Sequence, residues 1–243
     1  MDQPAAAPAW QLLPVADHAI YIDFGEVIDE QINRRVTALA ARLKAAAPAG
    51  ITSLIPTYRS LTVNYDSTQV RQQALIQQLE QLLAETAEAD APSKCWHIPV
   101  CYGGQYGIDL PELAATHGLS EQETIAIHSA TRYRVYMIGF MPGFAYLGGL
   151  DARLHTPRRV EPRLKVPAGS ISIGGMQTAV GSVAAPSGWH LLGRTPVRSF
   201  DPTRESPFLL QAGDNVRFFT ISERQFEQLA AARHYLPEWS WQA

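Results

Sequence analysis

The sequence predicts an α+β protein with two domains, a ferredoxin-like α/β domain over residues 1–92 and a β-barrel domain over residues 93–243. Two observations carry this prediction. Helix and strand patterns alternate up to residue 101. Between Tyr133 and Glu223, in contrast, no long helical pattern occurs, and short alternating runs between Gly/Pro turns dominate. The length of 243 residues is enough for two such domains.

The first domain follows from the order strand, helix, strand, strand, helix, strand. Ile32, Val36, Leu39 and Leu43 are spaced to form one apolar face of a helix, and Asp29 can cap its N-terminus. The second helix is expected from about Val70 to residue 89. The four strands are expected at residues 19–24, 51–55, 60–65 and 94–101. This order is the split βαβ arrangement of ferredoxin-like folds, which by itself says nothing about chemistry.

The second domain contains two helix starts with the sequence of a capping box, Ser120 with Glu123 and Ser222 with Gln225. Residues 216–221 alternate as in a strand. Together with the short strands after Tyr133, this pattern predicts a closed or nearly closed β-barrel. Exposed tryptophans are costly, so we expect the tail over residues 237–243, which has two, to dock on the barrel or on a partner.

Bulk composition excludes several classes of protein. The chain is 46% hydrophobic and 18% charged, as in an ordinary soluble protein, and a net charge of −3 gives no case for nucleic-acid binding. No apolar run is long enough to span a membrane, and the N-terminus has no secretory signal pattern, so we expect a cytoplasmic protein. On one strand Cys95 and Cys101 would lie about 20 Å apart, so we expect free thiols. The scattered histidines predict no metal site.

The residues with the most special chemistry lie between Tyr133 and Pro196. Glycine, proline and aromatic rings alternate over residues 139–147, which is more typical of a pocket wall or lid than of a plain surface loop. Core packing explains such rings at least as often. The candidate rings are Phe140, Phe144, Tyr146 and Trp189.

A cationic segment follows these rings, and prolines at positions 157, 162 and 167 hold it extended. Guanidinium groups on a rigid segment suit carboxylate or phosphate recognition. Arg163 is the first candidate for a ligand contact, then Arg158 and then Arg194. The alternative for each is a salt bridge that clamps the loops of the barrel, which is more plausible still for Arg159 and Lys165.

The remaining polar candidates are weaker. Gln177 and Thr178 can hydrogen-bond an amide or a carboxylate of a ligand, but a structural polar pair explains them almost as well. His128 and His190 fit histidines that are hydrogen-bonded inside a fold. The sequence has neither a G-x-S-x-G elbow nor a GxxxxGK[ST] phosphate loop, and Glu161 is the one carboxylate between Asp151 and Asp201. The stretch therefore offers binding groups without an acid–base pair, and its chemistry needs a second polypeptide.

Three blocks in this stretch, GFMPGFAYLGGL, PRRVEPRLKVPAGSISIGGMQT and SGWHLLGRTP, resemble the signature blocks of the PxpB/KipI family, also known as the allophanate hydrolase subunit 1 family. The resemblance continues through AIYIDFG, IPTYRSLTVNYD, IPVCYGGQYGIDL and GDNVRFFTIS, so it covers most of the chain. It implies that the barrel is of the cyclophilin-like type.

The resemblance also implies a function. The first expectation is the B component of a bacterial ATP-dependent 5-oxoprolinase, an enzyme that opens 5-oxo-L-proline to L-glutamate. This component is expected to be active only in complex with the A and C components of the enzyme. ATP is then a co-substrate of the complex. The alternatives are an inhibitor of a sensor histidine kinase and a component of a urea carboxylase/allophanate hydrolase.

Overall fold

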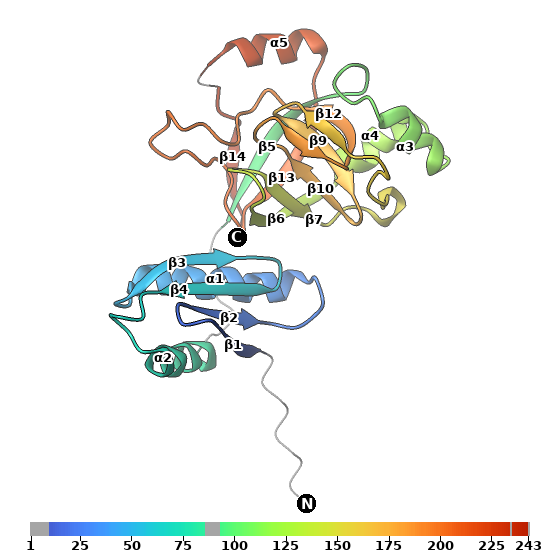
Figure 1. The fold of residues 1–243 in the computed structure, drawn as a ribbon. Coiled ribbons are helices and arrows are strands. Elements are labelled where there is room, and N and C mark those ends of the chain that lie inside the picture. Colours follow the sequence, from blue (N-terminus) through green and yellow to red (C-terminus); the bar gives the residue numbers. More distant parts are fainter. Residues whose placement is uncertain (1–9, 86–92, 234, 243) are drawn as a thin grey trace, which may run out of the picture. The chain divides into compact units, whose positions relative to one another are not determined.

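The computed structural model describes residues 10–85, 93–233 and 235–242 (Figure 1). The chain divides into two compact units, Met1–Ala91 and Pro92–Ala243, and each unit is described by itself.

The first unit is a four-stranded antiparallel sheet with two helices. The strands are β1 (Gln11–Val15), β2 (Ala19–Asp23), β3 (Ile51–Pro56) and β4 (Ser60–Tyr65), in the order β1-β2-β4-β3, and the helices are α1 (Glu30–Ala46) and α2 (Gln72–Ala84). Alternate residues of β2 and β4 share one hydrophobic core with the apolar faces of both helices. The side chain of Asp29 accepts from the backbone N–H groups of Gln31 and Ile32, so the predicted cap of α1 is confirmed.

The predicted ferredoxin-like sheet contained residues 94–101 as its fourth strand, and this assignment is wrong. Residues 94–101 form part of β5 (Ser93–Tyr102), which belongs to the sheet of the second unit. β1 takes the free edge of the first sheet instead, next to β2. The sequence pattern missed β1 because it is a mostly exposed edge strand, does not alternate, and contains Pro14, which edge strands tolerate.

The second unit is a closed β-barrel, as the strand pattern predicted, and it is consistent with the cyclophilin-like type. Seven strands follow one another in the order β12-β9-β10-β7-β6-β13-β5, and pairing of β12 with β5 closes the ring. Apart from β5, they are β6 (Arg132–Ile138), β7 (Ala145–Gly148), β9 (Ser170–Gly174), β10 (Gln177–Val180), β12 (His190–Arg194) and β13 (Asn215–Thr220). Inward-facing apolar side chains of these strands fill the barrel.

Shorter elements surround the barrel (Figure 1). They are the helices α3 (Leu110–Thr116), α4 (Glu121–Ala130) and α5 (Glu223–Ala231), the 3-10 turn η1 (Ala152–Leu154), and the two-stranded sheet of β8 (Arg163–Val166) and β11 (Ala185–Ser187). Both predicted capping boxes are present, at the N-termini of α4 and α5. Cys95 and Cys101 are free and buried, as expected.

The C-terminal tail docks on the barrel. Its strand β14 (Trp239–Gln242) pairs with β5, and the ring of Trp239 lies 6.2 Å from that of Trp96. The ammonium group of Lys94 lies 4.6 Å from the Trp239 ring, a cation–π contact. Trp241 nevertheless remains 61% exposed.

Candidate functional site

The loop between β6 and β7 holds Phe140 in a rare backbone conformation. The Met141 N–H donates to the Gly139 carbonyl at 2.8 Å, and Phe140 between them has a φ of +68°. A hydrogen bond across one residue of positive φ defines the rarer, strained form of γ-turn. Phe140 is 64% exposed, so burial does not explain why the ring is held there. Strain of this kind concentrates at binding sites.

The rest of the loop is fixed by close packing. Gly143 has a φ of +73°, and a Cβ atom there would lie 2.6 Å from the Cβ atom of Phe200. The Ser199 hydroxyl donates to the Gly143 carbonyl at 3.1 Å. Only glycine meets both demands of this position, its backbone angle and its lack of space. The loop therefore presents its rings in one arrangement.

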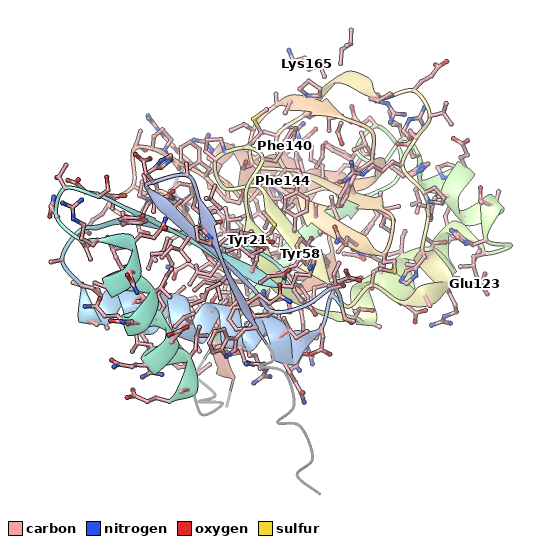
Figure 2. All side chains as sticks on the ribbon, turned by 60° about the horizontal axis from the view of Figure 1, so that its bottom comes forward. Tyr21, Tyr58, Glu123, Phe140, Phe144 and Lys165 are labelled. Atoms are coloured by element: carbon pink, nitrogen blue, oxygen red, sulfur yellow. The ribbon has the colours of Figure 1, made fainter. Side chains whose placement is uncertain are left out.

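Four rings form one cluster, which we call the aromatic cluster: Phe140, Phe144, Tyr146 and Trp189. Phe140 lies next to Phe144 (Figure 2), with 5.8 Å between ring centroids and 84° between planes. Phe144 and Tyr146 are 4.8 Å apart, and Tyr146 meets Trp189 edge to face at 5.9 Å. These separations are those of stabilising aromatic pairs. Exposure falls along the cluster from Phe140 to Trp189, which is buried.

Arg158 covers the buried end of the aromatic cluster. Its guanidinium carbon lies 5.8 Å from the Trp189 ring centroid. The side chain is exposed, and within the described part of the chain no carboxylate oxygen lies within 4.0 Å of its nitrogens. Burial raises the pKa of Tyr146, and the charge of Arg158 partly offsets that rise. A cation beside rings, without a carboxylate partner, suits the carboxylate of a small ligand.

Arg163, the first candidate from the sequence, has a different environment. Its two terminal nitrogens donate to the two carboxylate oxygens of Asp109 at 2.8 and 2.6 Å. Asp109 is buried, and it also accepts from Arg159 at 3.2 Å and from the Leu191 N–H at 2.7 Å. This is the loop clamp that the sequence left open as the alternative.

Asp109 is the residue of this region that sequence reasoning missed. Burial by itself would raise its pKa, but the hydrogen bonds from Arg163 and Leu191 and the charges of Arg163 and Arg159 outweigh burial, so the pKa lies below its ordinary value. Asp109 lies 54 positions before Arg163. The available signal was a set of arginines in a rigid segment that needed a counter-charge, which does not say where the carboxylate lies.

Thr178 belongs to a buried hydrogen-bonded chain inside the barrel. Its hydroxyl donates to the Ser172 carbonyl at 3.0 Å and lies 3.0 Å from His128 Nε2. His128 Nε2 must therefore donate, and its Nδ1 accepts from the Tyr102 hydroxyl at 2.8 Å. Burial lowers the pKa of His128 to about 3, so the ring is neutral at physiological pH. The side chains of Thr178 and His128 thus have hydrogen-bond partners within the barrel, as in the structural alternative that the sequence left open.

The other polar candidates, His190, Gln177 and Lys165, differ in how far they are buried and bonded within the protein. His190 Nε2 donates to the Pro157 carbonyl at 3.0 Å, which fixes the chain just before Arg158. Gln177 is half-buried at the start of β10. Lys165 is exposed and projects outward from β8 (Figure 2).

Arg194 is not brought together with the aromatic cluster. It ends β12, whereas Trp189 precedes the first residue of that strand. Five residues of extended chain separate the two Cα atoms by about 16 Å. Arg194 Nε donates to the Ala168 carbonyl at 2.7 Å, and its guanidinium carbon lies 5.7 Å from the Phe226 ring. The predicted site residues therefore occupy both ends of β12.

The aromatic cluster and Arg158 place a cation beside apolar rings, and none of these side chains is a nucleophile or a base at neutral pH. The raised pKa of Tyr146 keeps its hydroxyl protonated, and the neutral His128 is buried in the core. No group of three or more His, Cys, Asp or Glu residues among the described residues could hold a metal ion. The arrangement suits an anionic ligand with a compact apolar body.

The family model "Carboxyltransferase domain, subdomain C and D" matches residues 10–210. The chain is 42% identical over 228 residues to the B component of the 5-oxoprolinase of Bacillus subtilis, an alignment that covers 89% of this chain and 95% of that protein. The chain belongs to the family of 5-oxoprolinase B components. The residues matched by the family model run through the first unit and into the second as far as residue 210, and they include all four rings of the aromatic cluster.

Solved structures show the same fold. The crystal structure of TTHA0988 matches with a TM-score of 0.77 and 39% identity, and the match covers 84% of this chain and 40% of that chain. The Kluyveromyces lactis urea amidolyase matches with a TM-score of 0.79 at 19% identity, over 99% of this chain and 17% of that chain. In both, the fold of this family member is one segment of a longer chain. No helix among the described residues is long and apolar enough to cross a membrane.

Proposed function

We propose that this chain is the B component of an ATP-dependent 5-oxoprolinase, which opens the lactam of 5-oxo-L-proline to L-glutamate together with the A and C components. The observation that carries the proposal is the 42% identity to a 5-oxoprolinase B component over 95% of its length. The environment of the candidate site supports it, because the aromatic cluster and Arg158 provide binding groups without a nucleophile or a base of suitable pKa. The missing groups then come from the other two components.

Within this proposal, Arg158 binds the carboxylate of 5-oxo-L-proline. The substrate is a small, flat ring with one negative charge. Its ring can lie against Phe144 and Tyr146, which are half-buried, while the guanidinium over Trp189 pairs with the carboxylate. Arg163 and Asp109 act indirectly, because their ion pair holds β8 and the start of β12 in place.

The described residues of this face do not fit a triphosphate. ATP needs several cationic groups or a phosphate-binding loop, and the sequence has no such loop. Arg163 is paired with Asp109, and Arg159 with Asp109 and Glu112, so among the described residues Arg158 is left as the guanidinium without a carboxylate partner next to the aromatic cluster. We therefore place the ATP phosphates on another component of the complex, with this chain supplying contacts to the organic substrate.

The test is reconstitution from purified components. This chain alone should turn over no 5-oxo-L-proline, addition of the C component should give ATP hydrolysis that depends on 5-oxo-L-proline, and addition of both the A and C components should release glutamate. Arg158→Ala in the full complex should lower kcat/KM about ten- to a hundredfold, because a charge-assisted hydrogen bond is lost. Arg217→Ala, which removes an exposed arginine from β13, is the matched control and should leave the rate unchanged.

Two outcomes would contradict different parts of the proposal. A complex that hydrolyses ATP without regard to 5-oxo-L-proline would remove the substrate assignment. A folded Arg158→Ala complex with the wild-type rate would leave the assignment to the 5-oxoprolinase complex intact and exclude Arg158 as a substrate contact.

A further inference from the structure

A cavity lies in the barrel unit, at the opposite end of β12 from the aromatic cluster. It has a volume of about 270 Å³. Its walls come from the loop before β9, the loop after β12 and the helix α5, which lies at one end of the barrel (Figure 1). The lining residues that matter are Ser182, Arg194, Arg198, Phe226 and Ala230.

Arg194 is held in this cavity with its terminal nitrogens available. Nε is occupied by the Ala168 carbonyl, and the guanidinium plane is supported by the Phe226 ring. Phe226 is itself fixed against Tyr106, with ring centroids 4.5 Å apart. No carboxylate oxygen of the described residues lies within 4.0 Å of Arg194. A preorganised fork without a counter-ion suits a carboxylate or phosphate oxygen.

Ser182 provides an independent second observation. The residue is only 8% exposed, it lines the cavity, and its hydroxyl has no hydrogen-bond partner among the described residues. A buried hydroxyl without a partner costs free energy, which a ligand that hydrogen-bonds it would recover.

The polarity, charge and volume of the rest of the cavity limit the kind of ligand that it can hold. Phe226, Ala230 and Val197 are apolar, so part of the ligand must be apolar as well. Arg198 at the rim is exposed and forms an ion pair with Asp201 at 3.8 Å, which leaves Arg194 as the guanidinium of the cavity without a carboxylate partner among the described residues. At about 30 Å³ for each water-sized group, the volume holds roughly nine non-hydrogen atoms.

We propose that this cavity is a second ligand site, which binds a small carboxylic acid with a compact apolar body through Arg194 and Ser182. The carboxylate pairs with the free edge of the Arg194 guanidinium, the apolar body lies on Phe226, and a polar atom of the ligand meets the Ser182 hydroxyl. The site is argued from its own residues and does not depend on the proposed 5-oxoprolinase activity.

Titration calorimetry of the isolated full-length chain tests the site, with cyclopentanecarboxylate, 5-oxo-L-proline and inorganic phosphate as separate probes. We expect one of the two carboxylates to bind more tightly than phosphate. Arg194→Gln should weaken that binding about ten- to a hundredfold. Ser182→Ala should weaken binding of 5-oxo-L-proline severalfold without lowering the thermal midpoint, because the hydroxyl has no protein partner to lose. Arg217→Gln, on the exposed face of β13, is the control and should bind as the wild type does.

Backbone amide chemical shifts keep the test independent of whether Arg194→Gln folds. In the Arg158→Gln chain, which lacks the proposed carboxylate contact of the aromatic cluster, the bound carboxylate should still shift the amides of Gly169, Ser182 and Ala230. Shifts confined to the aromatic cluster, with Kd sensitive to Arg158→Gln and not to Arg194→Gln, would overturn the proposal. Tighter binding of phosphate than of either carboxylate would overturn it too, as would the absence of any binding.

Discussion

Arg158 and Arg163 lie five residues apart in one proline-rich segment, yet the structure gives them opposite environments. Arg163 forms a two-pronged ion pair with the buried Asp109, whereas Arg158 is exposed over Trp189 with no carboxylate beside it among the described residues. A guanidinium that is already neutralised holds the fold together, and one that is not can bind a ligand. Arg158 and Arg163 are the same residue type in the same rigid segment, so neither property distinguishes a structural arginine from a ligand-binding one. The position of the Asp109 carboxylate does.

The largest effect is expected for Asp109→Ala. It leaves Arg163 without its counter-charge, leaves Arg159 with only the more distant carboxylate of Glu112 at 3.9 Å, and removes the acceptor for the Leu191 N–H. Because the two arginines are about a quarter exposed, we expect a loss of about 3 kcal/mol in the free energy of unfolding, at the lower end for a buried ion pair. Urea unfolding followed by tryptophan fluorescence measures it. A loss below about 1 kcal/mol would show that the clamp is not needed.

The pH dependence of stability should carry a smaller signature of the same ion pair. The pKa of Asp109 is lower in the folded chain than its ordinary value of 3.8. The unfolded chain therefore binds a proton before the folded chain does, and the contribution of Asp109 is lost as pH falls below about 4. The slope is at most about 1.4 kcal/mol per pH unit. Urea unfolding of wild type and Asp109→Asn between pH 5 and pH 3 should show that the variant lacks this component, and parallel curves would contradict the expectation.

The smallest effect on stability is expected for Arg158→Ala. Its cation–π contact with Trp189 is exposed to water, so we expect a change of about 0.5 kcal/mol or less. The same urea experiment measures it beside Asp109→Ala. A loss as large as that of Asp109→Ala would erase the distinction between the two arginines and assign a structural role to both.

Much of the fold could be predicted because its signals are local. The apolar face of α1 and the capping boxes at Ser120 and Ser222 depend on residues within one or two turns. Which sheet residues 94–101 join, in contrast, depends on strands that are far away in the sequence. A strand pattern looks the same whichever sheet it joins, and β5 joins β13, which follows it by 120 residues, and β14, which lies further on still.

The candidate site was likewise predictable where its residues are close in the sequence, and not where they are distant. The aromatic cluster could be found because its loop combines glycine, proline and rings within nine residues. The pairing of Arg163 with Asp109, the burial of Thr178 beside His128, and the separation of Arg194 from Trp189 depend on contacts between distant segments. Residue type indicated which groups can bind anions, and the closed barrel determined which of them are accessible.

The way in which the barrel closes has a consequence for how this chain folds during synthesis. β5 pairs in parallel with β13, so the ring joins residues 93–102 to residues 215–220. All strands of the first sheet, in contrast, lie between residues 11 and 65. Contacts of long sequence separation form late and slowly. The first unit is therefore expected to fold while the ribosome still holds the rest, whereas the barrel must wait, with its strand edges unprotected, until nearly the whole chain has emerged.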